Sequence, residues 1–291
     1  MKKYIIGVIV LLVVGGGFYW FMKPTVAPFA EVIEKDTVIA GDYTVPKGIT
    51  MVFKNNATLT VQKDLIIEGS LTCEEGLLNL AVGGATTIQG SIACDAGIAI
   101  LAQGAFAMGE SALLESNGDI RVTDDASQTI QTSSPLTFIQ AVHAQEMRTV
   151  GAGLGGTVRI KPLVQGQSPL VMFYFSKGRE LIIPNFTLEG ADGAAGTDDV
   201  NKSCNARGGK GGDASRVMIV APTISIIGVV NANLGDGGKG GAAITVGNCD
   251  PGIAAGGAGG LPGSLALQAD MISMKGAGVL NVNPGKGGIG G

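Results

Sequence analysis

The sequence predicts an all-β protein: a right-handed parallel β-helix (solenoid) with a glycine-rich loop layer, preceded by one N-terminal transmembrane helix. Three observations predict it, namely an uncharged N-terminal run, a short repeat of alternating apolar residues, and a longer glycine-rich repeat. Of 291 residues, 48 are glycine, while apolar residues make up 45% and aromatic residues 5%. So many glycines without a Gly-X-Y period exclude collagen, and so many apolar residues exclude a disordered chain.

Residues 1–24 predict a membrane anchor. Residues 4–22 carry no charge and follow directly on Lys2 and Lys3. Their length is close to the ~20 residues that a helix needs to cross a bilayer, and the lysines favour a cytoplasmic N-terminus. A cleaved signal peptide is the alternative, although its apolar run is usually only about 7–15 residues long. We expect a single-pass cell-membrane protein with a linker over 25–35 and the bulk outside the cytoplasm.

Residues 36–123 predict a first stack of coils. The stretch 66–76 (IIEGSLTCEEG) matches 87–97 (TIQGSIACDAG) at a step of 21 residues, and 109–118 is a third copy. One copy is too small to bury its own apolar side, so stacked copies would form a solenoid with equivalent residues about 4.8 Å apart. No six-residue period is evident, which favours the right-handed form.

The alternation assigns side chains to the inside and the outside of each coil. We expect Ile67, Leu71 and Cys73 to point inward, with the polar residues between them outward. The same step predicts stacked apolar positions in successive coils: Leu59 with Leu80 and Leu101, and Ile92 with Leu113.

Residues 124–156 interrupt the repeat. Ser134 and Pro135 are a typical helix start, because proline is tolerated at the first helical position. The apolar residues over 136–147 are spaced for one short helix. We expect an irregular insertion, or a junction between two stacks.

Residues 157–291 predict a glycine-rich stack with a step of about 48 residues. The stretch 217–241 matches 265–288, and 180–196 is a looser copy. Each copy has two or three short strands and then a glycine-rich excursion. Glycine tracts can form extended helices like polyproline II, which pack side by side where no β-carbon would fit. We therefore hypothesise that the excursions form a second layer.

The two repeat systems over 36–291 resemble the glycine-rich right-handed parallel β-helix proteins of bacterial cell surfaces, an adhesin-like group. The resemblance implies a structural or adhesive role, non-catalytic, with a surface glycan, a partner or another copy of the chain as ligand. Residues 36–122 also resemble bactofilins, which would imply a self-polymerising scaffold. Other β-helices are polysaccharide lyases or hydrolases, and an enzyme of that kind would use loop carboxylates here: Asp192, Asp198, Asp199 and Asp213.

Three glycine-rich stretches each contain a lysine in a similar setting: Lys210 in 206–215, Lys239 in 235–243 and Lys286 in 283–291. A phosphate-binding loop is not indicated, because glycine follows each lysine and no helix is predicted after it. A calcium-binding glycine repeat matches in part at one place only, which makes Asp213 the single calcium candidate. We expect the glycines to serve close backbone packing.

The four cysteines of an exported chain suggest oxidation. Cys204 and Cys249 hold matching positions in neighbouring excursions, so we predict a disulfide between them. Cys73 and Cys94 lie one coil apart on the inward face, where the Cα separation allows a bridge. Parallel side chains in register orient poorly for one, so a buried ladder of two thiols is an equal alternative. With His143 as the only histidine and no CxxC, we expect no zinc site.

The remaining features favour a structural or adhesive protein over an enzyme. A net charge of −4 gives no reason to expect nucleic acid as a partner. Nothing near His143 suggests a catalytic triad. Residues 283–291 stop within a repeat, so we expect a partner on the open edge or a longer natural chain.

Overall fold

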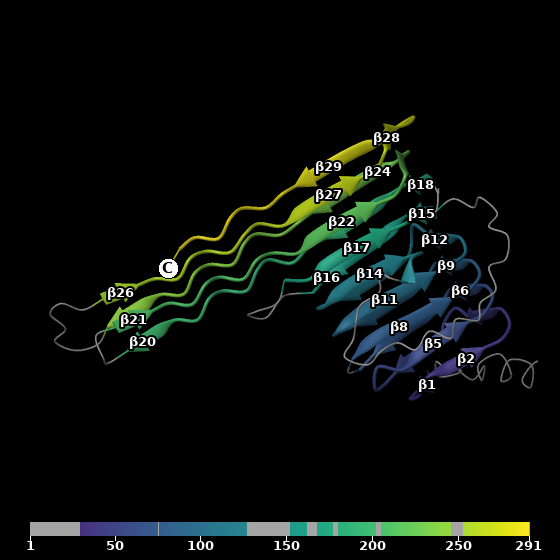
Figure 1. Cartoon of the computed structure of the whole chain (residues 1–291), viewed down its shortest axis with the longest axis horizontal. Coiled ribbons are helices and arrows are strands. Elements are labelled where there is room, and N and C mark those ends of the chain that lie inside the picture. Colours follow the sequence, from purple (N-terminus) through teal and green to yellow (C-terminus); the bar gives the residue numbers. More distant parts are fainter. Residues whose placement is uncertain are drawn as a thin grey trace, which may run out of the picture.

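A computed structural model describes residues 30–74, 76–126, 152–161, 168–176, 180–201, 205–245 and 253–290. All helices and strands assigned within these residues are β-strands. They build three long parallel sheets, called A, B and C. The chain passes through sheets A, B and C in the same order in each turn and so winds as a solenoid (Figure 1). The predicted all-β parallel architecture is confirmed.

Each sheet takes one strand from each turn. Sheet A contains, in spatial order, β1 (Ala30–Ile33), β4 (Thr50–Phe53), β7 (Ser70–Cys73), β10 (Ser91–Cys94), β13 (Leu113–Ser116), β16 (Gly156–Ile160), β19 (Phe186–Glu189), β24 (Val229–Asn233) and β29 (Val279–Asn283). Sheet B contains β2 (Thr37–Ile39), β5 (Thr58–Val61), β8 (Leu77–Val82), β11 (Gly97–Ala102), β14 (Asp119–Thr123), β17 (Leu170–Tyr174), β22 (Arg216–Val220) and β27 (Ser264–Gln268).

Sheet C forms the third wall, and two small sheets lie apart from the solenoid. Sheet C contains β3 (Tyr43–Val45), β6 (Leu65–Ile67), β9 (Thr86–Ile88), β12 (Phe106–Met108), β15 (Ala152–Leu154), β18 (Glu180–Ile183), β23 (Thr223–Ile226) and β28 (Met271–Met274). The small sheets are β20 (Asp199–Asn201) with β25 (Ala243–Thr245), and β21 (Asn205–Arg207) with β26 (Ile253–Ala255).

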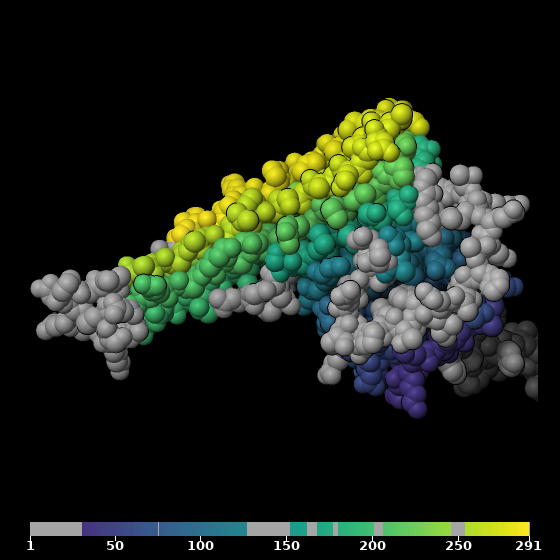
Figure 2. All heavy atoms as spheres, viewed as in Figure 1, coloured from purple at the N-terminus to yellow at the C-terminus, as the bar shows by residue number. Residues whose placement is uncertain are grey.

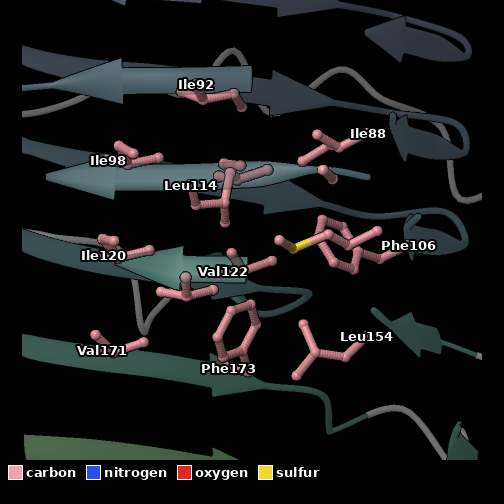
Figure 3. Packing of buried hydrophobic residues seen from close by; sticks show 14 of the residues in the cluster. Ile88, Ile92, Ile98, Phe106, Leu114, Ile120, Val122, Leu154, Val171 and Phe173 are labelled. Carbon is pink, nitrogen blue, oxygen red and sulfur yellow. The ribbon is translucent and has the colours of Figure 1, made fainter. Parts of the chain in front are cut away.

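The core lies inside the solenoid and consists of stacked apolar side chains (Figure 3). Ile98 of β11 pairs with Ile120 of β14, which pairs with Val171 of β17, and all three are buried. Ile67, Leu71 and Cys73 are buried as predicted, while Glu68 and Glu74 between and beside them are exposed. Alternation along each strand therefore places one face of each sheet in a shared interior.

Two predicted ladders are wrong by one residue. Leu114, not Leu113, pairs with Ile92 and is fully buried. Ile100, not Leu101, pairs with Leu80. The corners between strands differ in length from turn to turn, so a constant step of 21 residues cannot follow the register, and a one-residue slip changes which face a side chain occupies.

The two repeat systems form one continuous stack. β13 pairs with β16, β14 with β17 and β12 with β15, although residues 127–151 separate these strands in the sequence. The longer repeat arises because the chain leaves sheet A after β19 and after β24, runs outward, and returns to sheet B at β22 and at β27.

Several sequence predictions lie outside the described residues. These are the anchor over 4–22, residues 25–29 of the linker over 25–35, the helix within 136–147, His143, Cys204 and Cys249. The rest of that linker is described, and within it β1 (Ala30–Ile33) pairs with β4 as the first strand of sheet A. In the part of the chain that the structure describes, no helix is long and apolar enough to cross a membrane.

Candidate functional site

The glycine-rich excursions form a projection from the solenoid, which we call the arm (Figure 1). It consists of five glycine segments and the two small sheets β20–β25 and β21–β26. Segments 1, 3 and 5 run outward from sheet A, and segments 2 and 4 return to sheet B. In chain order the segments cover residues 190–198, 208–215, 234–242, 256–263 and 284–290.

Backbone hydrogen bonds join the segments at every third residue. In segment 1, the N–H groups of Gly193 and Gly196 donate to carbonyl oxygens of segment 3. In segment 4, Gly257, Gly260 and Gly263 also donate to segment 3. A period of three residues without hydrogen bonds inside a segment is that of polyproline II. Segment 3 is bonded to all four other segments and forms the centre of the arm.

Glycine is required where the segments touch. A β-carbon on Gly238 would overlap the carbonyl oxygen of Ala194 in segment 1, and one on Gly260 would overlap that of Gly212 in segment 2. These are backbone contacts, which no side-chain rotation can relieve. The hypothesis that the excursions form a packed second layer is confirmed for the described residues, and the reason is steric.

The three lysines that looked equivalent in sequence do not gather at one place. Segment 2, with Lys210, runs opposite to segments 3 and 5. On segments 3 and 5, Lys286 lies beside Asp236, whose Oδ1 accepts its backbone N–H, and Lys239 lies one turn further out beside Ile289. All three lysines are exposed. They occupy separate outward-facing positions, between the glycines that contact neighbouring segments. A phosphate-binding loop would instead need a lysine in a loop between a strand and a helix.

The aspartates of the arm hold its backbone together. Each accepts a backbone N–H of another arm residue: Asp192 from Asp236 at 2.6 Å, Asp198 from Ala242 at 2.7 Å, Asp199 from Arg207 at 2.8 Å and Asp213 from Leu261 at 2.9 Å. These are the four carboxylates that the enzyme hypothesis needs. Asp192 and Asp198 lie six residues apart on one extended segment, about 19 Å at polyproline II rise. Paired glycosidase carboxylates are only about 5–9.5 Å apart, so Asp192 and Asp198 do not form such a pair.

The same device recurs at the corners of the solenoid. There, an Asp or Asn side chain of one coil accepts a backbone N–H from the next coil, which satisfies an amide that the sheets leave unpaired. The pairs are Asp36–Thr58, Asp42–Asp64, Asn56–Leu77, Asp64–Ala85, Asp119–Leu170, Asp124–Ser176 and Asn185–Val229, and Asp236–Lys286 is a further pair within the arm. The turn chemistry of Asp and Asn therefore also joins coils that are distant in sequence.

Asp213, the calcium candidate, has protein partners. Besides Leu261, its Oδ1 accepts a hydrogen bond from Nζ of Lys210 at 3.2 Å. The backbone bond from Leu261 is the main cause that lowers the pKa of this carboxyl group, and the charges of Lys210 and Arg216 add to it. Within the described residues, no three His, Cys, Asp or Glu side chains lie close enough to hold a metal ion together.

We expect the Asp213 carboxyl group to titrate below its ordinary pKa of 3.8. Because the folded pKa is below that of the unfolded chain, the ionised group stabilises the fold above the unfolded pKa. That contribution is lost as the pH falls through the folded pKa. A ¹³C NMR titration of labelled aspartate measures it, and Lys210→Ala should move the pKa back toward 3.8. A wild-type pKa at or above 3.8 would contradict the contacts with Leu261 and Lys210.

The inward cysteines of the first stack form a disulfide. Cys73 in β7 and Cys94 in β10 are direct neighbours in sheet A, with their Cα atoms 4.6 Å apart, and the bond joins two successive coils. This decides between the two alternatives that the sequence leaves open. Cys204 and Cys249 lie outside the described residues, and their disulfide stays a prediction. It is supported by the pairing of the flanking strands, β20 with β25 and β21 with β26.

We expect the Cys73–Cys94 disulfide to raise the free energy of unfolding by about 3 kcal/mol, the value for a loop of this length. Peptide mapping without reductant identifies the bond, and it also tests Cys204 with Cys249. Urea unfolding of the double variant Cys73→Ala/Cys94→Ala measures the stability, with Cys204→Ala/Cys249→Ala as the control for the other pair. Recovery of free Cys73 and Cys94 from protein made in an oxidising compartment would contradict the assignment.

An ion-pair network on sheet A was not predicted from the sequence. Arg159 of β16 contacts Glu115 of β13 at 3.2 Å and Glu189 of β19 at 2.5 Å. Lys161 contacts Asp95 at 3.1 Å and also Glu115. The partners are far apart in sequence and meet only because the coils stack. The charges are partly exposed, so water screens each pair and its contribution to stability is small.

A comparison of the chain with protein-family models, with curated proteins and with solved structures finds no match. What the structure defines is a fold class, an all-β parallel solenoid with a glycine-rich arm.

Proposed function

We propose that this chain is a membrane-anchored, extracytoplasmic protein with a structural or adhesive role, built on a right-handed β-helix like those of adhesin-like surface proteins. The arm is the observation that carries the proposal. Segment 1 alone spans about 28 Å at about 3.1 Å per residue. The arm projects from the solenoid (Figure 2) and carries the two small sheets at its outer end (Figure 1), where Val200 and Ile244 are exposed. A stiff projection of this kind suits the presentation of a surface to a glycan, a partner or another copy.

Two further observations support the proposal. The apolar run over 4–22 predicts export, and the Cys73–Cys94 bond suits an oxidising compartment. The four carboxylates available for a polysaccharide-cleaving enzyme each accept a backbone N–H through one oxygen, which gives each of them a structural use. A display role requires nothing of these carboxylates beyond the hydrogen bonds that they already accept.

The test uses the full chain in proteoliposomes, which are applied to immobilised surface polysaccharides and to intact bacterial cells. We expect binding by the wild type. Gly238→Val, which should disrupt the arm, is expected to abolish binding. Gly287→Ala should retain it, because a β-carbon at Gly287 meets no atom within 4 Å.

Two results would count against the proposal. Equal binding by wild type and Gly238→Val would show that the arm does not contribute to binding. Cleavage of a uronate-rich polymer that is lost in Asp198→Ala/Asp199→Ala would favour the enzyme. For topology, external protease should remove the arm from intact cells and leave an N-terminal tag protected. The opposite pattern would contradict the predicted anchor.

A further inference from the structure

Segment 2 of the arm joins β21 to β22 and presents every third residue to solvent (Figure 1). The backbone N–H groups of Gly209 and Gly212 donate to segment 1, and those of Gly211 and Ala214 donate to segment 4. The remaining third of the positions forms one outward row. Its three cations are exposed and its aspartate is partly exposed. We call this set the charged row, and it consists of Arg207, Lys210, Asp213 and Arg216.

The two arginines of the charged row have no carboxylate partner. The structure describes four arginines, of which Arg121 and Arg159 each contact acidic side chains. Arg207 and Arg216 form no ion pair with any residue that the structure describes. A guanidinium group is a planar fork of donors that matches the two oxygens of a carboxylate. The arginine side chains at both ends of the row are therefore suited to bind an anion from outside the chain.

The middle of the charged row differs from its ends. Nζ of Lys210 donates to Oδ1 of Asp213 at 3.2 Å, and the lysine side chain is 60% exposed. Oδ2 of Asp213 accepts no hydrogen bond from the described residues. An ammonium group has three donors, so Lys210 retains donors for a ligand. A ligand along the row must therefore offer anionic groups at the arginines and a hydrogen-bond donor at Asp213.

The charged row is long and straight, and an uncharged strip lies beside it. From Arg207 to Arg216 it spans about 28 Å at about 3.1 Å per residue. On segment 4 and the adjoining β26, the neighbouring outward residues are Ala255, Ala258 and Leu261, and Leu261 is 64% exposed. Such a strip gives the C–H faces of sugar rings an apolar surface to contact. The shape therefore suits an extended polymer that lies along segment 2.

We infer that the charged row binds an acidic polysaccharide, with carboxylate groups of the polymer at the two arginines and sugar hydroxyl groups at Asp213. A uronic acid unit carries both kinds of group. The inference rests on the proposed adhesive role and specifies the class of its ligand.

The composition of the arm disfavours other polyanions. Residues 190–215 and 234–263 contain no aromatic residue on which the bases of a single-stranded nucleic acid would stack. An anionic membrane surface attracts clusters of four or more basic residues. The charged row has three cations and includes an aspartate, which would repel the closely spaced phosphates of either ligand.

Binding of the full chain in neutral detergent to immobilised polygalacturonate tests the inference. We expect the wild type to bind, and to bind more weakly as salt is added, because salt screens exposed charges. Arg207→Gln/Arg216→Gln is expected to bind at least about tenfold more weakly, since it loses charge-assisted hydrogen bonds. Fully methyl-esterified polygalacturonate has the same sugars without the charges, and the wild type should bind it as weakly.

The matched control removes two charges from the other layer of the arm. Lys239→Gln/Lys286→Gln changes exposed side chains on segments 3 and 5 and should bind like the wild type. Far-UV circular dichroism checks that both double variants fold. Three results would each overturn the inference: equal losses in the two variants, equal binding of the acid and the ester, and competition by single-stranded DNA or phosphatidylglycerol vesicles as strong as by polygalacturonate.

The same variants separate this inference from the proposed function. If the wild type binds intact cells, Gly238→Val does not, and Arg207→Gln/Arg216→Gln binds as well as the wild type, the adhesive role stands and the acidic polysaccharide is excluded. If the wild type binds neither cells nor any polysaccharide, the proposed function fails together with the inference.

Discussion

Replacing Gly238 by valine is expected to break the arm while the solenoid stays folded. Gly238 lies in segment 3, where its added β-carbon would overlap the carbonyl oxygen of Ala194 and approach that of Gly193. The obstructing atoms are backbone, so segments 1 and 3 would have to separate. Overpacking usually costs about 1–3 kcal/mol, and occasionally more where the surroundings cannot adjust. We expect a loss of about 3 kcal/mol or more, confined to the arm.

Hydrogen exchange distinguishes a loss of structure in the arm from unfolding of the whole protein. In the wild type, we expect slow exchange at the bonded glycine amides of segments 2, 3 and 4. In Gly238→Val these amides should exchange fast, while amides of β8 and β11 in the solenoid stay protected. Gly287→Ala is the matched control, because its β-carbon would enter open space. Fast exchange of the arm amides already in the wild type would contradict the packed layer.

Replacing Phe173 by alanine is expected to destabilise the solenoid by about 3–5 kcal/mol, the usual cost of removing a fully buried phenylalanine. Phe173 is 0% exposed and lies between Val122 of β14 and Ile219 of β22. Its ring packs edge-on against Phe186, with the ring centroids 6.2 Å apart (Figure 3 shows its place in the core). The stack is continuous on both sides, so the cavity cannot close without displacing two coils.

Urea unfolding followed by far-UV circular dichroism measures this effect. Tyr174→Ala is the control on the same strand, because Tyr174 points outward and is partly exposed. We expect this control to lose much less stability than Phe173→Ala. Equal losses from the two variants would mean that the alternation in β17 is out of phase with the core.

Much of the solenoid could be predicted because its determinants are local. Alternation places Ile67 and Leu71 inside regardless of what lies above them, and their burial follows. The recurrence of glycine-rich tracts was also visible in the sequence and led to the hypothesis of a packed layer, while the three-residue period became evident from the backbone hydrogen bonds. The register was less predictable. Leu114 replaces Leu113 in the core because corner lengths vary, and no single step length describes them.

The candidate site was predicted less well than the fold. Asp192, Asp198, Asp199 and Asp213 are of a residue type that serves both catalysis and turns, and only the structure shows that each accepts a backbone N–H from another part of the arm. Lys210 looked equivalent to Lys239 because repeat spacing carries no information on chain direction. The bonds of Arg159 to Glu115 and Glu189 join three different coils, so no local pattern reveals them.

The amino-acid pattern was enough to predict the fold class, because it contains strands with alternating apolar residues, coils that must stack, and glycine tracts that tolerate close contact. These are properties of single residues and of their spacing, so they are present before the chain folds. The folded chain was needed to show that Cys73 and Cys94 are bonded and that segment 2 lies against segments 1, 3 and 4. Each of these depends on which coil lies beside which, and that is set by packing across the stack.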